Sequence, residues 1–396
     1  MKATEKAVAE VKTKKPKTKQ KHVHEPLLHI SKRDKLPFYK ALLIRVAAIA
    51  AALVFSGVVT IILTGDNPLS IYKTMFEGAL GSSLRIWVTF QEVAILLCVA
   101  LAITPAFKMR FWNTGAEGQV LIGGLVTAMC MFFIKDSVPT WLLIVIMTVS
   151  SILAGAIWGI IPAVFKAYWG TNETLFTLMM NYVAIQAIEI FLKFADKSGS
   201  NTVGPSLLAH GWFPSLFGQK YLLNILIVAI ITLLVWVYLK YTKHGYEISV
   251  VGESENTALY VGINVKKVII RTMAISGAIC GIAGLLLVGG TSHSIDSNIA
   301  DGRGFTAIMV SWLAKFNPFV MILVSFLLVF LSRGAEEVST KFGLNTSFAD
   351  IITGIILFFI IGCEFFIQYK VQINKSHKLF SSKKTNKTEN TEKEVV

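Results

Sequence analysis

Long apolar runs, separated by short polar segments, dominate this sequence. They are rich in Leu, Ile, Val, Ala and Phe, and several are as long as the roughly 20 residues that a helix needs to cross a hydrocarbon core about 30 Å thick. Only 16% of the 396 residues are charged, far fewer than in a soluble domain of this size. The sequence therefore predicts an all-α, polytopic membrane protein.

The apolar runs predict about ten transmembrane helices. The eighth is short enough to be a half-span, and an even number of crossings returns the chain to the side on which it starts. The predicted spans are residues 41–64, 87–106, 114–134, 141–165, 173–194, 221–241, 268–290, 305–316, 318–333 and 350–369.

Two basic tails flank this transmembrane domain, which we place at 41–369. Residues 1–40 hold twelve Lys and Arg against four Asp and Glu, a net charge of +8, and residues 370–396 hold seven against three, a net of +4. The tails thus carry twelve of the fourteen excess positive charges. Basic polar tails are typical of the cytoplasmic side, so we expect both termini there, with the N-terminal tail disordered. No basic face studded with aromatic residues points to nucleic acid.

Motifs for catalysis and nucleotide binding are missing from the sequence. There is no G-x-x-x-x-G-K-[ST] phosphate loop and no G-x-S-x-G nucleophile turn. The four cysteines, Cys98, Cys130, Cys280 and Cys363, lie inside apolar runs without C-x-x-C spacing, which indicates small buried side chains. We expect no enzyme, no metal site and no cofactor bound by this chain.

Polar residues open the third span. Asn113, Glu117 and Gln119 enter an otherwise apolar helix. A carboxylate at membrane depth costs about 2–3 kcal/mol, so it normally faces a cavity, a partner or the interface. Glu117 either lies beside a pathway or in a gate, or it lies near the cytoplasmic surface and caps its own helix.

A second polar group opens the fifth span. Asn172 is a good N-cap, Glu173 follows it, and Thr177 and Asn181 lie further along the same helix. Amide side chains inside a bundle line a path for polar solutes or hydrogen-bond neighbouring helices. All four are candidate pathway residues.

Small residues predict two tightly packed helices. Gly277, Gly281 and Gly284 share one face of the seventh span, and Gly155 and Gly159 share one face of the fourth. Such spacing lets helix backbones approach closely. We interpret it as packing.

Two loops are long. The predicted extracellular loop 195–220 contains several Gly and Pro residues, which prevent a long helix, and carries Trp212 and Phe213, which suit the membrane interface. The predicted cytoplasmic loop 240–267 contains a short helix from Glu255 to Val261, with Ser254 as its cap and Gly262 as its stop. This helix is either a docking element or an ordinary connector.

Four segments carry a resemblance to a known family. Phe111–Gln119 resembles the F-N-x-G-A-E-G-Q signature of nucleoside-type permeases in the ribose/branched-chain group of ABC importers. Asn172–Tyr182 resembles N-E-x-x-x-T-L-M-x-N-Y, Gly252–Gly262 resembles G-x-x-x-x-A-A-x-Y-x-G-I, and Gly302–Pro318 resembles G-x-G-F-x-x-I-x-V-x-x-L ending in Asn-Pro. The segments follow one another in the family order.

Small departures from the patterns are an extra Trp112, Thr114 in place of Ile, and Thr257 in place of Ala. The resemblance implies a ten-helix permease subunit in the cytoplasmic membrane of a bacterium. It implies a separate ATPase that uses ATP and Mg²⁺, a second permease, and an extracellular solute-binding lipoprotein. The residues implied to contact the ATPase are Gly252, Glu253, Glu255, Asn256, Ala258, Tyr260 and Gly262.

The resemblance favours nucleosides as the solute, with a sugar such as ribose as the alternative. A transporter driven by protons or sodium is the rival from another class. A transporter of that class requires buried acidic residues at broken helices, at corresponding positions in the two halves of the chain. Glu117 and Glu189 are the acids that the sequence places within spans, and no matching halves are evident.

Overall fold

The computed structural model describes residues 28–33, 37–65, 67–134, 137–196, 201–343 and 345–373. Most of the two predicted tails lies outside these residues. The chain divides into two compact units, Met1–Leu53 with Leu357–Val396, and Val54–Ile356. We describe each unit by itself.

In the described residues, nine helices are long and apolar enough to cross a membrane. Each coincides with a predicted span, so the all-α polytopic class is confirmed. The nine are α1 (Phe38–Thr64), α3 (Ser83–Lys108), α4 (Ala116–Phe133), α5 (Thr140–Trp169), α6 (Glu173–Ala195), α7 (Leu222–Tyr241), α10 (Val265–Leu287), α12 (Pro318–Phe342) and α13 (Thr346–Gln368).

The short helices differ more from expectation. The predicted half-span is α11 (Arg303–Leu313), which is too short to cross, and α10 continues into one π-helical turn, η1 (Val288–Ser292). Helix α2 (Pro68–Leu80) was not predicted, although Asn67 and Pro68 form a typical helix start. Helix α8 (Lys243–Glu253), which precedes the predicted short helix α9 (Glu255–Tyr260), was not predicted either.

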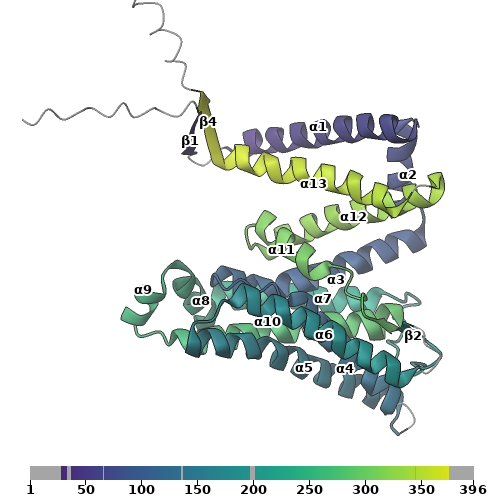
Figure 1. The fold of residues 1–396 in the computed structure, drawn as a ribbon, viewed down its shortest axis with the longest axis vertical. Coiled ribbons are helices and arrows are strands. Elements are labelled where there is room, and N and C mark those ends of the chain that lie inside the picture. Colours follow the sequence, from purple (N-terminus) through teal and green to yellow (C-terminus); the bar gives the residue numbers. More distant parts are fainter. Residues whose placement is uncertain are drawn as a thin grey trace, which may run out of the picture. The chain divides into compact units, whose positions relative to one another are not determined.

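Glycines bring α4, α5 and α10 together in the larger unit, where the three helices run side by side (Figure 1). A Cβ atom on Gly155 would lie 2.2 Å from the carbonyl oxygen of Gly277, and one on Gly123 would lie 2.6 Å from Cα of Gly281. Only glycine allows this approach, so the packing role predicted from the small-residue pattern is confirmed.

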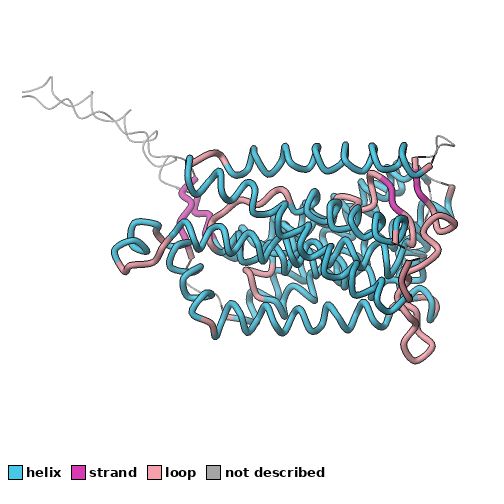
Figure 2. Tube along the Cα trace, turned by 90° about the horizontal axis from the view of Figure 1, so that it is seen from below, coloured by secondary structure: helices cyan, strands magenta, loops and turns pink. Residues whose placement is uncertain are grey.

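The larger unit has two distinct ends. Helices α8 and α9 lie at one end, and the two-residue strand β2 (Thr202–Val203) lies at the other, as Figures 1 and 2 show. Strand β2 pairs antiparallel with β3 (Ile295–Asp296), which ties the predicted extracellular loop 195–220 to the segment that precedes α11. We refer to these as the α9 end and the β2 end.

The smaller unit contains an antiparallel strand pair, β1 (Leu28–Lys32) and β4 (Tyr369–Ile373), with Leu28 opposite Ile373. Next to it, the guanidinium of Arg45 in α1 forms an ion pair with the carboxylate of Glu364 in α13. A carboxylate in an apolar span needs such a partner.

Candidate functional site

The polar residues that open α4 lie inside the bundle. Asn113 and Gln119 are buried, and their side-chain amides pair reciprocally at 3.4 Å. The Asn113 amide also donates to the hydroxyl of Ser276 at 3.2 Å, and its oxygen accepts from the backbone N–H of Gly115 at 3.1 Å. Ser276 lies near the middle of α10. The non-helical segment that leads into α4 therefore reaches the middle of the bundle.

Glu117 links α4 to α11. Its carboxylate oxygens accept from the backbone N–H of Gly302 at 2.8 Å and of Gly304 at 2.6 Å. These groups have no partner within α11, and the positive end of the α11 dipole favours an anion there. A Cβ atom on Gly304 would lie 2.5 Å from the Glu117 nitrogen, so a glycine is needed for this contact. Glu117 thus caps α11 rather than its own helix.

Residues of α6 complete this cluster. The Asn181 side chain accepts from the N–H of Gly118 at 2.8 Å and donates to the carbonyl of Thr114 at 3.0 Å. The Thr177 hydroxyl accepts from the N–H of Thr114 at 3.2 Å. Asn181 and Thr177 are buried. Both therefore form interhelical hydrogen bonds, the second of the two roles considered for Asn181.

The two residues at the start of α6 form contacts local to that end of the helix. Asn172 accepts from the N–H of Leu175 at 3.1 Å, which confirms it as the N-cap. The Glu173 carboxylate pairs with the Lys166 ammonium at 2.8 Å. A pathway role for these residues stays a prediction.

The short helix predicted in the loop 240–267 is present as α9. The Ser254 hydroxyl accepts from the N–H of Thr257 at 3.2 Å, and Gly262 has a φ of +83°, which glycine adopts without strain. Of the residues implied to contact the ATPase, Gly252 and Ala258 are buried, and the others are exposed: Glu253, Glu255, Asn256, Tyr260 and Gly262. Gly252 packs against α3, because a Cβ atom there would lie 2.1 Å from the carbonyl oxygen of Lys108.

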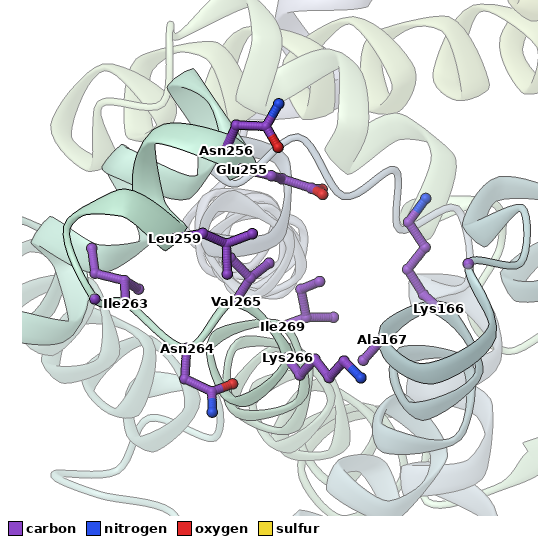
Figure 3. A pocket seen from close by; sticks show the side chains of 12 residues that line it. Lys166, Ala167, Glu255, Asn256, Leu259, Ile263, Asn264, Val265, Lys266 and Ile269 are labelled. Atoms are coloured by element: carbon purple, nitrogen blue, oxygen red, sulfur yellow. The ribbon is translucent and has the colours of Figure 1, made fainter.

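The tip of α9 exposes apolar side chains. Leu259 and Val261 are more than half exposed, and Tyr260 is 92% exposed. A cavity of about 670 Å³ opens beside the helix. In Figure 3 apolar side chains such as Ile269 lie between Glu255 on one side and Lys266 on the other. Such a combination of exposed apolar groups and charges is typical of a protein contact.

Helix α8 is anchored to α10 by an ion pair. The Arg271 guanidinium donates to the Glu247 carboxylate at 2.7 Å. This hydrogen bond lowers the pKa of Glu247 below its ordinary value, so the carboxylate is ionised at neutral pH. No period or motif in the sequence pairs these two residues.

A buried polar cluster at the β2 end was also missed. Gln91 donates to the hydroxyl of Thr291 and accepts from the Asn224 amide, the latter at 3.3 Å. Near this cluster, the rings of His293 and Trp212 stack with their centroids 4.2 Å apart. Burial and the nearby Lys220 lower the pKa of His293, which keeps the imidazole neutral at pH 7. Amides inside apolar runs were the signal that could have found this cluster.

Charged side chains within spans are more numerous than the sequence analysis stated. Besides Glu117 and Glu189, Glu92 lies in the third turn of α3 and Glu364 lies in α13. Glu92 forms an ion pair with Arg333 of α12, and Glu364 pairs with Arg45. The prediction that named only Glu117 and Glu189 was wrong, because Glu92 and Glu364 also fall within the predicted spans 87–106 and 350–369, and each is paired with an arginine of another helix.

Aromatic side chains gather where α3 and α11 end, at the α9 end. Trp112 and Trp312 stack with ring centroids 5.6 Å apart, and Phe107 lies edge-on to both. They line a cavity of about 450 Å³ together with Phe316, Lys108, Arg110, Ser249, Gly252 and Glu253. Arg110 has a φ of +62° and Phe316 a φ of +60°, which are uncommon for residues with side chains and cluster at functional sites.

No group of three or more His, Cys, Asp or Glu in the described residues is arranged to hold a metal ion. All four cysteines are buried and unpaired, as predicted. What the described residues form is a helical bundle with interrupted helices, buried polar contacts and one projecting helix.

Comparison with known families decides the class of the protein. The family of branched-chain amino acid transport system permease components matches residues 86–361. The chain belongs to this family. It is a membrane-embedded permease subunit and not an enzyme. No solved structure matches the chain.

Several curated relatives resemble the permease over most of its length. The nucleoside ABC transporter permease protein NupB of Lactococcus lactis is 28% identical over 84% of this chain and 93% of its own. The guanosine ABC transporter permease protein NupP of Bacillus subtilis is 26% identical over 77% and 89%. The glucose ABC transporter permease protein TsgB13 of Haloferax volcanii is 26% identical over 87% and 94%.

NupB and NupP each have a counterpart that also matches. NupQ of Bacillus subtilis is 24% identical over 60% of this chain, and NupC of Lactococcus lactis is 23% identical over 60%. In both organisms, two different permeases are therefore similar to this chain.

Proposed function

We propose that this permease carries nucleosides across the cytoplasmic membrane of a bacterium, as one of two permease subunits of an ATP-driven importer. Two relatives named for guanosine and nucleosides cover more than three quarters of the chain, which supports the solute class. ATP and Mg²⁺ would be used by a separate ATPase, and an extracellular lipoprotein would deliver the solute.

The structural observation that carries the coupling role is the exposed apolar tip of α9. Leu259, Tyr260 and Val261 lie at the α9 end and are each more than half exposed. We place this end in the cytoplasm, with both termini, and assign α9 and the adjacent cavity to the ATPase contact. Gly252 would transmit movement of α9 to α3, because its backbone touches Lys108.

The candidate pathway residues then acquire a different role. Asn113, Glu117 and Asn181 join α4 to α10, α11 and α6. We propose that they act as the fixed points of a gate, holding the interrupted helices together while the bundle tilts. Gln119 and Thr177 support Asn113 and the α4 backbone within the same cluster.

An uptake assay tests which class of solute the permease carries. Cells with and without the gene are given radiolabelled uridine, guanosine and ribose. We expect deletion to abolish nucleoside uptake alone, and ATP depletion to have the same effect. Loss of sugar uptake with normal nucleoside uptake would instead support the second candidate, a sugar importer, which the similarity to the glucose permease TsgB13 favours.

Co-purification tests the ATPase contact. Tyr260→Ala should release the ATPase and abolish uptake, whereas Tyr246→Ala on the exposed surface of α8 should change neither. Ala258 is a poor test position, because it is fully buried and Ala258→Arg would disturb α9 itself. Normal assembly of Tyr260→Ala would refute the docking role of this tip.

A further inference from the structure

The start of α11 lies at membrane depth. With 11 residues, α11 is about 16 Å long at roughly 1.5 Å per residue, half of a bilayer core. The Glu117 carboxylate binds the N–H groups of Gly302 and Gly304 there, beside the segment that contacts the middle of α10. Non-helical backbone inside a membrane must be buried in protein or line a water-filled cavity.

Charged side chains lie near this point and are partly exposed, because Glu92 is close enough to Arg303 to interact with it electrostatically. Glu92 of α3 pairs with Arg333 of α12, which also pairs with Glu336 at 3.1 Å. Arg303, the first residue of α11, lies 3.8 Å from Asp301, and the Asp301 side chain is 68% exposed. Charges at this depth do not face lipid. Because these side chains are partly exposed in this subunit, they face either a second subunit or water.

The same face of α11 continues as an apolar stripe. Phe305, Met309 and Trp312 follow at helical spacing and are exposed. Trp312 stacks on the exposed Trp112, and the pair borders the cavity that contains Arg110. The stripe thus joins the charged group at one end to a basic, aromatic cavity at the α9 end.

We propose that this face of α11, with Glu92 and Arg333 at its start and Trp112 and Trp312 at its end, is the wall of the water-filled translocation pathway in this subunit. It suits a solute that has hydroxyl groups and a flat ring. The charged groups hydrogen-bond the hydroxyls, and the tryptophans stack on the ring. The choice of solute rests on the proposed function, but the presence of water along this face does not.

Thiol labelling tests for water along the face. The four native cysteines are buried, which gives a low background. We expect a charged, membrane-impermeant methanethiosulfonate reagent, applied to the assembled transporter from either side, to label Asp301→Cys and Met309→Cys. Ile190→Cys on α6 should stay unlabelled although Ile190 is 70% exposed and Met309 only 38%, because a lipid-facing thiol does not ionise.

If Met309→Cys were as unreactive as Ile190→Cys, the face would be covered by lipid or by the second permease, and the proposal would be refuted. This measurement needs no solute, so it fails independently of the proposed function.

Solute protection tests the ring-binding end. Uridine should slow the labelling of Met309→Cys, and Trp312→Ala should lower nucleoside uptake several-fold while Trp312→Phe retains most of it. Trp169→Ala is the matched control, because Trp169 is an exposed aromatic residue at the end of α5, outside this face. Equal uptake by Trp312→Ala and Trp169→Ala, in cells whose uptake depends on the gene, would refute stacking at this site.

Discussion

Two sets of polar residues meet at α11, and they differ in what surrounds them. On the α4 side, Asn113, Glu117 and Asn181 are buried, and each forms a hydrogen bond to another helix. On the other side, Asp301 and Arg303 form one long ion pair and remain exposed in part. Polar residues in a membrane chain therefore divide into those that join helices and those that meet water.

The difference shows that a polar side chain within a membrane span can have either of two roles. An amide or carboxylate inside a span is costly unless it is satisfied, and either a neighbouring helix or water can satisfy it. The buried set should therefore control stability, and the exposed set should control transport. Three changes test this division, and a fourth tests an ion pair outside the spans.

The largest effect is expected at Glu117. Glu117→Ala removes the acceptor of the buried Gly304 N–H and of the partly buried Gly302 N–H, and an unpaired buried group costs about 1–3 kcal/mol. We expect a large fall in the melting temperature of the purified protein in detergent. Glu117→Gln keeps one neutral acceptor oxygen, so its melting temperature should lie between those of Glu117→Ala and the wild type. A wild-type melting temperature for Glu117→Ala would remove Glu117 from the buried set.

The second-largest effect is expected at Asn181. Asn181→Leu leaves the N–H of Gly118 and the carbonyl of Thr114 unpaired, with an expected loss of about 1–3 kcal/mol in unfolding free energy. Tyr182→Leu is the control, because Tyr182 is the exposed neighbour on the same helix and should change stability by less than about 0.5 kcal/mol. If Asn181→Leu kept its stability but lost transport, Asn181 would line the pathway.

Asp301→Asn should show the reverse pattern. The side chain is largely exposed and its ion pair is long, so we expect a stability change below about 0.5 kcal/mol. Nucleoside uptake should nevertheless fall several-fold, because a charge on the pathway wall is lost. A stability loss as large as that of Asn181→Leu would place Asp301 with the buried set.

The smallest effect concerns Glu247, outside the spans. Its pKa is lowered by Arg271, so the pair stabilises the fold above the ordinary pKa of a glutamate, and this contribution is lost as the pH falls through the lowered value. Glu247→Gln should melt slightly below the wild type at pH 7, and the difference should shrink at pH 4. A constant difference across this range would mean that the charge of Glu247 does not contribute.

The sequence by itself determined the features that depend on local chemistry. Apolar length predicted every long helix, small-residue spacing predicted that α5 and α10 each have a close-packing face, and Ser254 and Gly262 predicted the limits of α9. These predictions succeed because a helix satisfies its own backbone hydrogen bonds and ends at residues that can cap it. The family resemblance was likewise carried by short local motifs.

Only the tertiary structure decided which polar groups meet. Glu117 caps a helix 185 residues further along the chain, and Glu92 pairs with an arginine 241 residues away. Such contacts depend on which helix faces pack together, and the apolar composition of the spans carries little information about that choice, since lipid and neighbouring helices are equally apolar. For the same reason, the tertiary structure alone separated the buried residues of α4 and α6 from the exposed face of α11.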